Sequence, residues 1–324
     1  YNYRDNRWKK CINGGKLITL MSSSFANCYC EAAQKSNTMA IKAQGMDKKK
    51  FIEEASLYNK IADSLMDITF KEKIMKVALL NDTHCGVRNN HQMFAEYQGR
   101  FYSQIFFPYI DKHNIKTIIH LGDYFDRRRD VNFYSLHKNY EHFVKPLLDR
   151  NITMDLIVGN HDIYFKNTNE LNSPDYLLDF ENINIYKDPI VKNYDGLDIC
   201  LVPWINTENY DDVEEFLGIC SADIVMCHGE ITGALVNPGN FQGGGTSPTL
   251  FKRFEQVYSG HYHHKSILGN IKFLGSQMEF TWNDFGNAKH FHILDTETRE
   301  IEAVHNPLKM FHKIFYDDTE ETLM

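Results

Sequence analysis

The sequence predicts a mixed α/β fold, a four-layer sandwich of two mixed β-sheets flanked by helices, preceded by a helical N-terminal extension. From residue 75 to residue 158, short apolar strands alternate with helical segments, which indicates parallel strands joined by right-handed crossovers. Further apolar runs follow with fewer helices between them, so a second sheet is expected. With 43% apolar residues, a chain of 324 residues can bury such a core.

The individual elements follow from apolar periodicity and from turn residues. Residues 47–73 have apolar side chains at helical spacing, and the run that opens at Met75 is typical of a buried strand. Next come helices near 91–113 and 132–149, with strands at 116–121 and 153–158. The later strands are expected near 183–187, 198–203, 222–227, 256–258, 271–274 and 290–294.

These elements divide the chain into an extension over residues 1–74, a main domain over 75–300 and a C-terminal segment over 301–324. Residues 1–74 contain 13 Lys and Arg against 8 Asp and Glu, whereas residues 75–324 contain 22 against 35. The acidic main part argues against nucleic-acid binding through bulk charge, so bound cations or a local arginine patch would have to compensate. Met75 could be a translation start, in which case residues 1–74 are an upstream region.

The same sequence predicts a cytoplasmic protein. No run approaches the roughly 18–20 apolar residues that a spanning helix requires, and the N-terminus lacks the pattern of a secretory signal. The seven cysteines are scattered rather than arranged as a dense framework, so reduced thiols are expected.

Polar residues follow directly after five of the expected strands. They are Asp82 and His84, Asp123 and Asp126, Asn160 and His161, then His228, and finally His261 and His263. Each group alone could be a turn or a buried structural residue. Because ligands bind beyond the carboxyl ends of strands in α/β sheets, their recurrence predicts one shared pocket.

The residue types in this set indicate a metal centre. Carboxylate, amide and imidazole donors suit Mn²⁺, Fe²⁺ or Zn²⁺, and the lack of an evident thiolate set argues against a closed structural zinc site. Two such ions about 3.5 to 4 Å apart can lower the pKa of a water between them and clamp a phosphate group. Hydroxide is then available near neutral pH.

The motifs D-x-H, GD-x-x-D, GNHD, a lone histidine and GH-x-H occur in this order, and the chain thereby resembles the calcineurin-like metallophosphoesterase superfamily over about residues 75–297. The resemblance implies the metallophosphoesterase fold and two divalent metal ions, with Mn²⁺ expected and Fe²⁺, Zn²⁺ or Mg²⁺ as alternatives. It implies that one ion is bound by Asp82, His84, Asp123 and His263. The second would be bound by Asp123, Asn160, His228 and His261, with Asp123 bridging the pair.

The resemblance also implies the residues that act on the substrate. His161 faces the substrate and protonates the leaving oxygen, a step that is typically worth about 10² to 10⁴ in rate. Asp126 matches the carboxylate that orients this histidine. Arg127, the first of three consecutive arginines, is the expected phosphate contact, although a solvated loop is an equally good reading of any one of them.

The stretches "HLGDYFDRRR", "IVGNHD", "LVPWI" and "CHGEITG" are similar to those of phage recombination endonuclease subunits and SbcD-type nucleases. This implies a nuclease in double-strand-break repair and recombination, with 3′-to-5′ exonuclease action on duplex DNA and endonuclease action on single strands. An SMC-like ATPase of the SbcC type and a second copy of the chain are the expected partners. Such nucleases continue into a capping domain and an ATPase-binding segment, so residues 301–324 are expected to begin a truncated capping region.

Two alternatives remain open. "GDYFDR" is similar to the motif of protein phosphatases, and the acidic charge also favours a phosphatase acting on phosphoproteins or small phosphoesters. A metal-bearing binding protein without catalysis is the third reading. The presence of His161 and Asp126 argues against it, because a scaffold needs no acid for a leaving group.

Overall fold

The computed structural model describes residues 2–4, 7–9, 27–36, 38–39, 46–70, 76–237 and 239–315. The chain divides into two compact units, residues 1–75 and residues 76–324. Among the described helices, none combines the length and the apolar character needed to cross a membrane.

The first unit contains a small hairpin and two helical segments. Strands β1 (Asn2–Arg4) and β2 (Arg7–Lys9) pair antiparallel. Residues 27–36 are helical, and α2 (Met46–Phe70) occupies most of the range expected for a helix, whose residues 71–73 lie outside the described part. The rings of Tyr29 and Tyr58 lie 6.1 Å apart, so the two helical segments contact each other.

The first sheet of the second unit has six strands in the order β16-β15-β3-β4-β5-β6. These are β16 (Ile301–Asn306), β15 (Lys289–Asp295), β3 (Lys76–Leu80), β4 (Thr117–His120), β5 (Thr153–Ile157) and β6 (Ile183–Tyr186). Strands β3 to β6 are parallel, and β15 and β16 add an antiparallel edge. Leu80 pairs with His120, and His120 with Leu156, so the carboxyl ends of β3, β4 and β5 are level.

The second sheet also has six strands, in the order β13-β14-β12-β9-β8-β7. These are β13 (Ser266–Leu268), β14 (Ile271–Phe273), β12 (Gln256–Ser259), β9 (Ile224–Cys227), β8 (Leu197–Val202) and β7 (Ile190–Tyr194). The inner strands β14, β12, β9 and β8 are parallel, while β13 and β7 form antiparallel edges. Both sheets are therefore mixed, as the sequence predicts.

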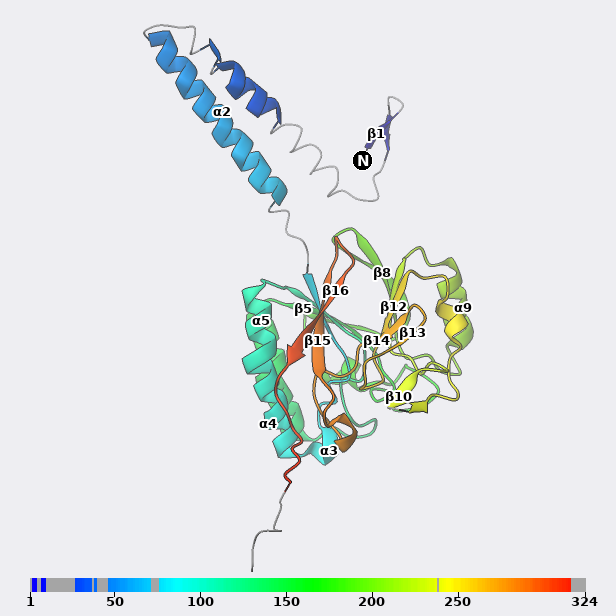
Figure 1. Ribbon diagram of the computed structural model, residues 1–324. Coiled ribbons are helices and arrows are strands. Elements are labelled where there is room, and N and C mark those ends of the chain that lie inside the picture. The colour runs from blue at the N-terminus through cyan, green and yellow to red at the C-terminus, as the bar shows by residue number, and fades with distance from the viewer. Residues whose placement is uncertain are drawn as a thin grey trace, which may run out of the picture. The chain divides into compact units, whose positions relative to one another are not determined.

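Helices cover the outer face of each sheet (Figure 1). Beside the first sheet lie α4 (Gln92–Phe101) with α5 (Phe107–Lys112), and α6 (Phe133–Asn139) with α7 (Lys145–Asp149); beside the second lies α9 (Tyr210–Ile219). One apolar core joins α4 to α7 with the first sheet, and another joins α9 with the second. The order helix, sheet, sheet, helix confirms the predicted four-layer sandwich.

The remaining elements are short and lie in the connections. They are α3 (Val87–Asn90), α8 (Ser173–Leu177), the strands β10 (Leu235–Asn237) and β11 (Asn240–Phe241), and the 3₁₀ turns η3 (Pro248–Phe251) and η4 (Trp282–Asp284).

Both long helices on the first sheet contain a π-helical turn, η1 (Tyr102–Phe106) and η2 (Tyr140–Val144). Each turn closes one residue before a proline, Pro108 or Pro146, through a bond from Phe107 to Tyr102 or from Lys145 to Tyr140. A proline has no N–H and its ring collides with the carbonyl four residues earlier. The wider turn lets each helix continue past its proline.

Candidate metal centre

The candidate site lies where strands of both sheets end. Loops after β3, β4 and β5 carry Asp82 and His84, Asp123 and Asp126, and Asn160 and His161 from the first sheet. Loops after β9 and β12 carry His228, His261 and His263 from the second. Because the carboxyl ends of parallel strands share one edge, these nine strand-end positions, which are distant in sequence, can meet in space.

The loop backbones are held in an unusual conformation. Asp82, His84, Asp123 and His261 all have positive φ, between 45° and 82°. Residues other than glycine adopt the left-handed, positive-φ region at a cost of about 1–3 kcal/mol each. Contacts with neighbouring residues must therefore hold these four residues in that conformation. The amides of Asp82 and His84 donate to the carbonyls of Gly122 and Asp123, at 3.0 and 3.1 Å.

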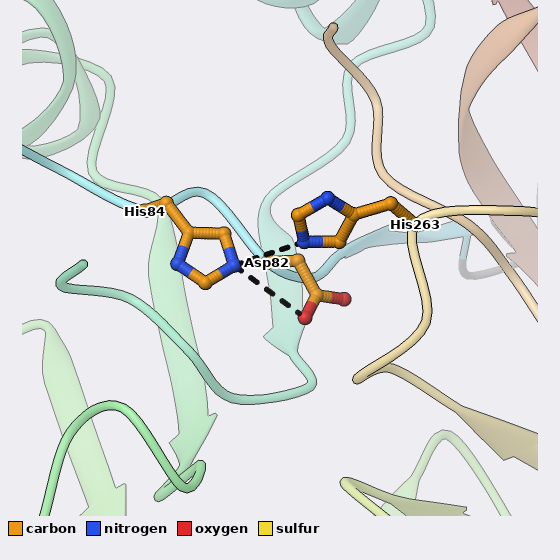
Figure 2. A group of neighbouring side chains, drawn as sticks. All are labelled: Asp82, His84 and His263. Carbon is orange, nitrogen blue, oxygen red and sulfur yellow. Dashed lines mark hydrogen bonds and ion pairs between the residues drawn. The ribbon is translucent and has the colours of Figure 1, made fainter. Parts of the chain in front are cut away.

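One group of donors consists of Asp82, His84 and His263 (Figure 2), whose ligand atoms all lie within 4.8 Å of one another. The Nε2 atoms of His84 and His263 are 3.1 Å apart, and Asp82 Oδ1 lies 4.0 Å from His84 Nε2. Two imidazole nitrogens at this distance, beside a buried carboxylate, form a donor set that fits a divalent cation.

A second group consists of Asp123, His228 and His261, again within 4.8 Å. Asn160 Oδ1 completes it at 3.0 Å from His228 Nε2 and 2.9 Å from His261 Nδ1. Asp123 Oδ2 is 3.2 Å from His228 Nε2 and 3.9 Å from His84 Nε2. This one carboxylate oxygen therefore lies beside donors of both groups.

Burial sets the protonation of most of these donors. It raises the pKa of Asp82, lowers that of His84 well below its usual range, and lowers that of His261 to about 3. The two imidazoles are consequently neutral, which is the form that binds a metal ion.

Asp123 and His228 behave as an ion pair. Burial alone would raise the pKa of Asp123, but the charge and hydrogen bond of His228 hold it well below its usual range. Burial opposes the charge on His228, yet Asp123 raises its pKa to about 9. Since His228 Nδ1 donates to the carbonyl of Leu121 at 2.7 Å, its Nε2 atom is the one that points at Asp123 and Asn160.

His161 lies beside the donor groups. Its backbone N–H donates to Asp123 Oδ1 at 2.7 Å, and its Nδ1 atom is 2.6 Å from the carbonyl oxygen of Asp126. The carboxylate of Asp126 instead lies 3.5 Å from His84 Nδ1. The main chain of Asp126, rather than its carboxylate, is thus at hydrogen-bond distance from His161. His84, Asp126 and His161 form a third group within 4.8 Å.

A pocket of about 350 Å³ opens onto both donor groups. Its walls include Arg88, Asn89, Arg127 and Phe280 in addition to the histidines and carboxylates. Arg127 is bonded to Asp130 at 3.3 Å and to Asn89, with its side chain 44% exposed. The ring of Phe280 packs edge-on against His84 and His263, both at 5.6 Å.

The sequence alone assigns no role to two supporting residues, Asn81 and Asp162. Asn81 donates to Asp82 Oδ2 at 2.5 Å, and Asp162 accepts from the amides of Phe125 and Gly159 at 3.0 and 2.9 Å. Burial raises the pKa of Asp162 to about 7, and the charge of Asp123 adds to this shift. Asn81 directly precedes a candidate ligand and Asp162 ends the GNHD motif, so adjacency is the signal that could have identified both.

Two glycines allow the loops around the site to approach one another closely. A Cβ atom on Gly159 would lie 2.2 Å from the amide nitrogen of Asp123, and one on Gly122 would lie 2.7 Å from Nδ1 of His228. Gly122 also has a φ of +82°. The loops after β4, β5 and β9 meet at their present distance only because these positions lack side chains.

The model of the calcineurin-like phosphoesterase family matches residues 75–265. The chain belongs to this family. Exonuclease subunit 1 of Enterobacteria phage T4 is 32% identical over 246 residues, which cover 75% of this chain and 71% of the phage protein. Calcineurin-like phosphoesterases are hydrolases that cleave ester bonds with the help of divalent metal ions, and the donor groups described above fit such ions.

Two solved structures are similar to parts of this calcineurin-like phosphoesterase. An archaeal phosphodiesterase is 16% identical with a TM-score of 0.37, and the match covers 72% of this chain and 100% of that one. The nuclease MPE of Pseudomonas putida is 16% identical with a TM-score of 0.33, over 67% of this chain and 83% of that one.

Proposed function

We propose that this protein is a metal-dependent DNA phosphodiesterase, the nuclease subunit of a double-strand-break repair and recombination complex. The observation that carries the proposal is the position of Asp123, whose Oδ2 atom lies beside donors of both groups, 3.9 Å from His84 and 3.2 Å from His228. Such a shared carboxylate is what two neighbouring ions require. The phage relative is an exonuclease subunit, which favours DNA as the substrate.

In this proposal one ion is bound by Asp82, His84, Asp123 and His263, and the other by Asp123, Asn160, His228 and His261. Mn²⁺ is the preferred metal, with Fe²⁺, Zn²⁺ and Mg²⁺ as alternatives, because the donors mix oxygen and imidazole nitrogen. When bound, the two ions would lower the pKa of a water molecule and neutralise charge on the phosphate.

His161 is proposed as the acid that protonates the leaving oxygen. A carbonyl oxygen can only accept, so the 2.6 Å contact with Asp126 places a proton on His161 Nδ1. The second ring nitrogen is then the one that gains and releases a proton. Asp126 is proposed to orient this ring through its main-chain carbonyl, and its carboxylate belongs to the same close group.

Arg127 is proposed to bind a phosphate oxygen of the substrate. It lines the same pocket as His161 and both donor groups, and its guanidinium is held by Asp130 and Asn89. A guanidinium that is fixed in place loses less side-chain entropy when it binds a phosphate.

The proposed partners are an SMC-like ATPase of the SbcC type and a second copy of the chain. The name of the phage relative, a subunit of an exonuclease, supports an assembly with other chains. The proposed actions are 3′-to-5′ exonuclease cleavage of duplex DNA and endonuclease cleavage of single strands.

A substrate panel tests the proposal. Linear duplex labelled at either end, single-stranded circular DNA, para-nitrophenyl phosphate and a phosphopeptide are each incubated with protein and Mn²⁺, with an EDTA control. We expect cleavage of both DNA substrates, 3′-to-5′ shortening of the duplex, and no cleavage in EDTA. If only the phosphopeptide and para-nitrophenyl phosphate were hydrolysed, the protein would instead be a phosphatase, which is the alternative function that the "GDYFDR" motif indicates.

A further inference from the structure

A second hollow of about 260 Å³ adjoins the metal pocket, because Arg127 lines both. We call it the side hollow. Its walls are formed by three consecutive arginines of the loop after β4, by residues of the loop after β5, and by α8. The lining residues include Arg127, Arg128, Arg129, Tyr164 and Tyr176.

Exposed aromatic rings surround the side hollow. Tyr176 is 71% exposed, Tyr164 is 43% exposed, and the neighbouring Phe165 is 51% exposed. The rings of Tyr164 and Phe165 meet edge-on with centroids 4.8 Å apart. Large aromatic side chains gathered on a surface mark a binding site more often than scattered ones do. These rings offer flat faces to a ligand with flat groups of its own.

The charge of the side hollow is positive. Among its described lining residues Asp130 is the acidic one, and it is paired with Arg127 at 3.3 Å. Arg128 and Arg129 add two further positive charges, and Nη1 of Arg128 is buried without a hydrogen-bond partner among the described residues. A buried guanidinium nitrogen without an acceptor is costly, so an anionic oxygen at this position would be stabilised.

We propose that the side hollow binds single-stranded DNA next to the phosphate that is cleaved, with bases stacked on Tyr164 and Tyr176 and phosphates bound by Arg128 and Arg129. The inference rests on the proposed nuclease function. Aromatic platforms combined with a basic groove are the general means of binding single strands without sequence preference. A protein partner fits less well, because Arg127 lines both the side hollow and the metal pocket, so that one strand could pass Arg127 and reach both.

The experiment measures binding of two labelled oligonucleotides of equal length by fluorescence anisotropy. One is oligo(dT) and the other carries abasic sites, so it has the same phosphates but no bases. Protein is loaded with Ca²⁺ in place of Mn²⁺, and a gel checks that both probes stay intact. The variants are Tyr176→Leu, which removes the flat ring, Tyr176→Phe, which retains it, and Tyr140→Leu, an exposed tyrosine outside both pockets.

We expect Tyr176→Leu to raise the Kd for oligo(dT) by about 5- to 150-fold, the range that corresponds to the loss of one base stack. Tyr176→Phe and Tyr140→Leu should bind oligo(dT) as the wild type does. The abasic probe should bind equally well to wild type and Tyr176→Leu, because it has no base to lose. Arg128→Gln should weaken both probes and reduce the salt slope by about 0.7.

Two other outcomes would overturn the stacking proposal or the proposed function. If Tyr176→Leu binds oligo(dT) as tightly as wild type, or weakens both probes alike, the stacking proposal is wrong although the protein can still be a nuclease, and the aromatic face is then left for a protein partner. If wild-type protein neither binds nor cleaves DNA, the proposed function itself fails and this inference fails with it.

Discussion

His161 has a fixed tautomer, because its Nδ1 atom faces the carbonyl of Asp126 at 2.6 Å. The remaining ring nitrogen is available for proton transfer to a leaving oxygen. We predict that His161→Ala lowers the rate of DNA cleavage by about 10² to 10⁴. The ion content should not change, because His161 belongs neither to the group of Asp82, His84 and His263 nor to the group of Asp123, His228 and His261.

The assay combines cleavage kinetics with elemental analysis of the same samples. His137→Ala is the control, since this exposed histidine on α6 is paired only with Glu141 in the described structure. A His161→Ala protein that cleaves DNA at the normal rate would remove the assigned acid. One that has lost its metal would show that the imidazole supports the ions instead.

Gly159 offers a second test at the same scale. We predict that Gly159→Ala destabilises the fold by about 1–3 kcal/mol and reduces metal content, because the added Cβ would lie 2.2 Å from the backbone of Asp123. Gly218→Ala in α9 is the matched control, since its Cβ would meet nothing within 4 Å and alanine favours a helix. Urea unfolding and elemental analysis measure both effects. If Gly159→Ala and Gly218→Ala had the same free energy of unfolding and the same metal content, the close approach of Gly159 to the backbone of Asp123 would be contradicted.

Site residues could be predicted from the sequence where they directly follow an apolar strand. Asp82, Asp123, Asn160 and His228 each follow a strand, and the structure brings them together. Phe280 and Trp204 contact the site from distant segments: the Phe280 ring lies 5.6 Å from His84, and the Trp204 ring lies 5.3 Å from His261. No local pattern specifies such contacts. The same limit applies to Asp126, whose main chain, not its side chain, meets His161.

At the scale of elements, β15 supports the loop that carries His263. Lys289 on this strand is 1% exposed and donates to Asp284 at 2.6 Å, to the carbonyl of His263 at 2.9 Å and to Ser276 at 3.1 Å. Burial lowers the pKa of Lys289, and Asp284 opposes that shift. The ammonium therefore links a strand of the first sheet to a loop of the second.

We predict that Lys289→Met destabilises the protein by about 3–5 kcal/mol, because it leaves the buried Asp284 unpaired. Lys145→Met is the control: Lys145 and Asp149 are also 2.6 Å apart but lie exposed on α7, where a pair contributes little. Urea unfolding measures both variants. If both variants lowered the free energy of unfolding by a similar, small amount, the buried pair of Lys289 and Asp284 would not stabilise the fold.

The same strand contains a buried imidazole. Burial lowers the pKa of His292 to about 3, with Lys265 and His290 adding to the shift. In the unfolded chain a histidine binds a proton below about pH 6.5, so stability falls as the pH drops from about 6.5 toward 3, by up to about 1.4 kcal/mol per pH unit.

We predict that His292→Leu reduces the loss of stability between pH 7 and pH 5. Urea unfolding at the two pH values tests this, with the exposed His137→Leu as control. An unchanged loss in His292→Leu would show that other groups cause it.

Strands with continuous apolar runs could be predicted, whereas of the four edge strands of the two six-stranded sheets only β6 was expected from the sequence. β3, β4, β5, β9 and β12 are almost entirely buried and lie where the sequence places them. β7 and β16 are edge strands with mostly exposed or half-buried residues, so their sequences resemble loops. Their pairing depends on the neighbouring strand. The π-helical turns likewise could not be read from a periodicity that assumes regular turns.

At the scale of the whole molecule, residues 76–324 form a compact unit with both sheets, both cores and all candidate site residues. We predict that a truncated chain beginning at Met75 folds and cleaves DNA at an unchanged rate, because a unit with its own core can fold alone. Circular dichroism melting and the duplex assay measure this. An insoluble or inactive truncated chain would show that residues 1–74 are needed for folding or activity.

The division of the donors between two sheets has a further consequence. Asp82, Asp123 and Asn160 follow strands of one sheet, and His228 and His261 follow strands of the other. A nascent polypeptide that ends after β6 lacks His228, His261 and His263, so it could assemble neither donor group in full. Under the proposed function, catalytic competence would therefore arise late in biosynthesis, after β12 and the loop that follows it have been made.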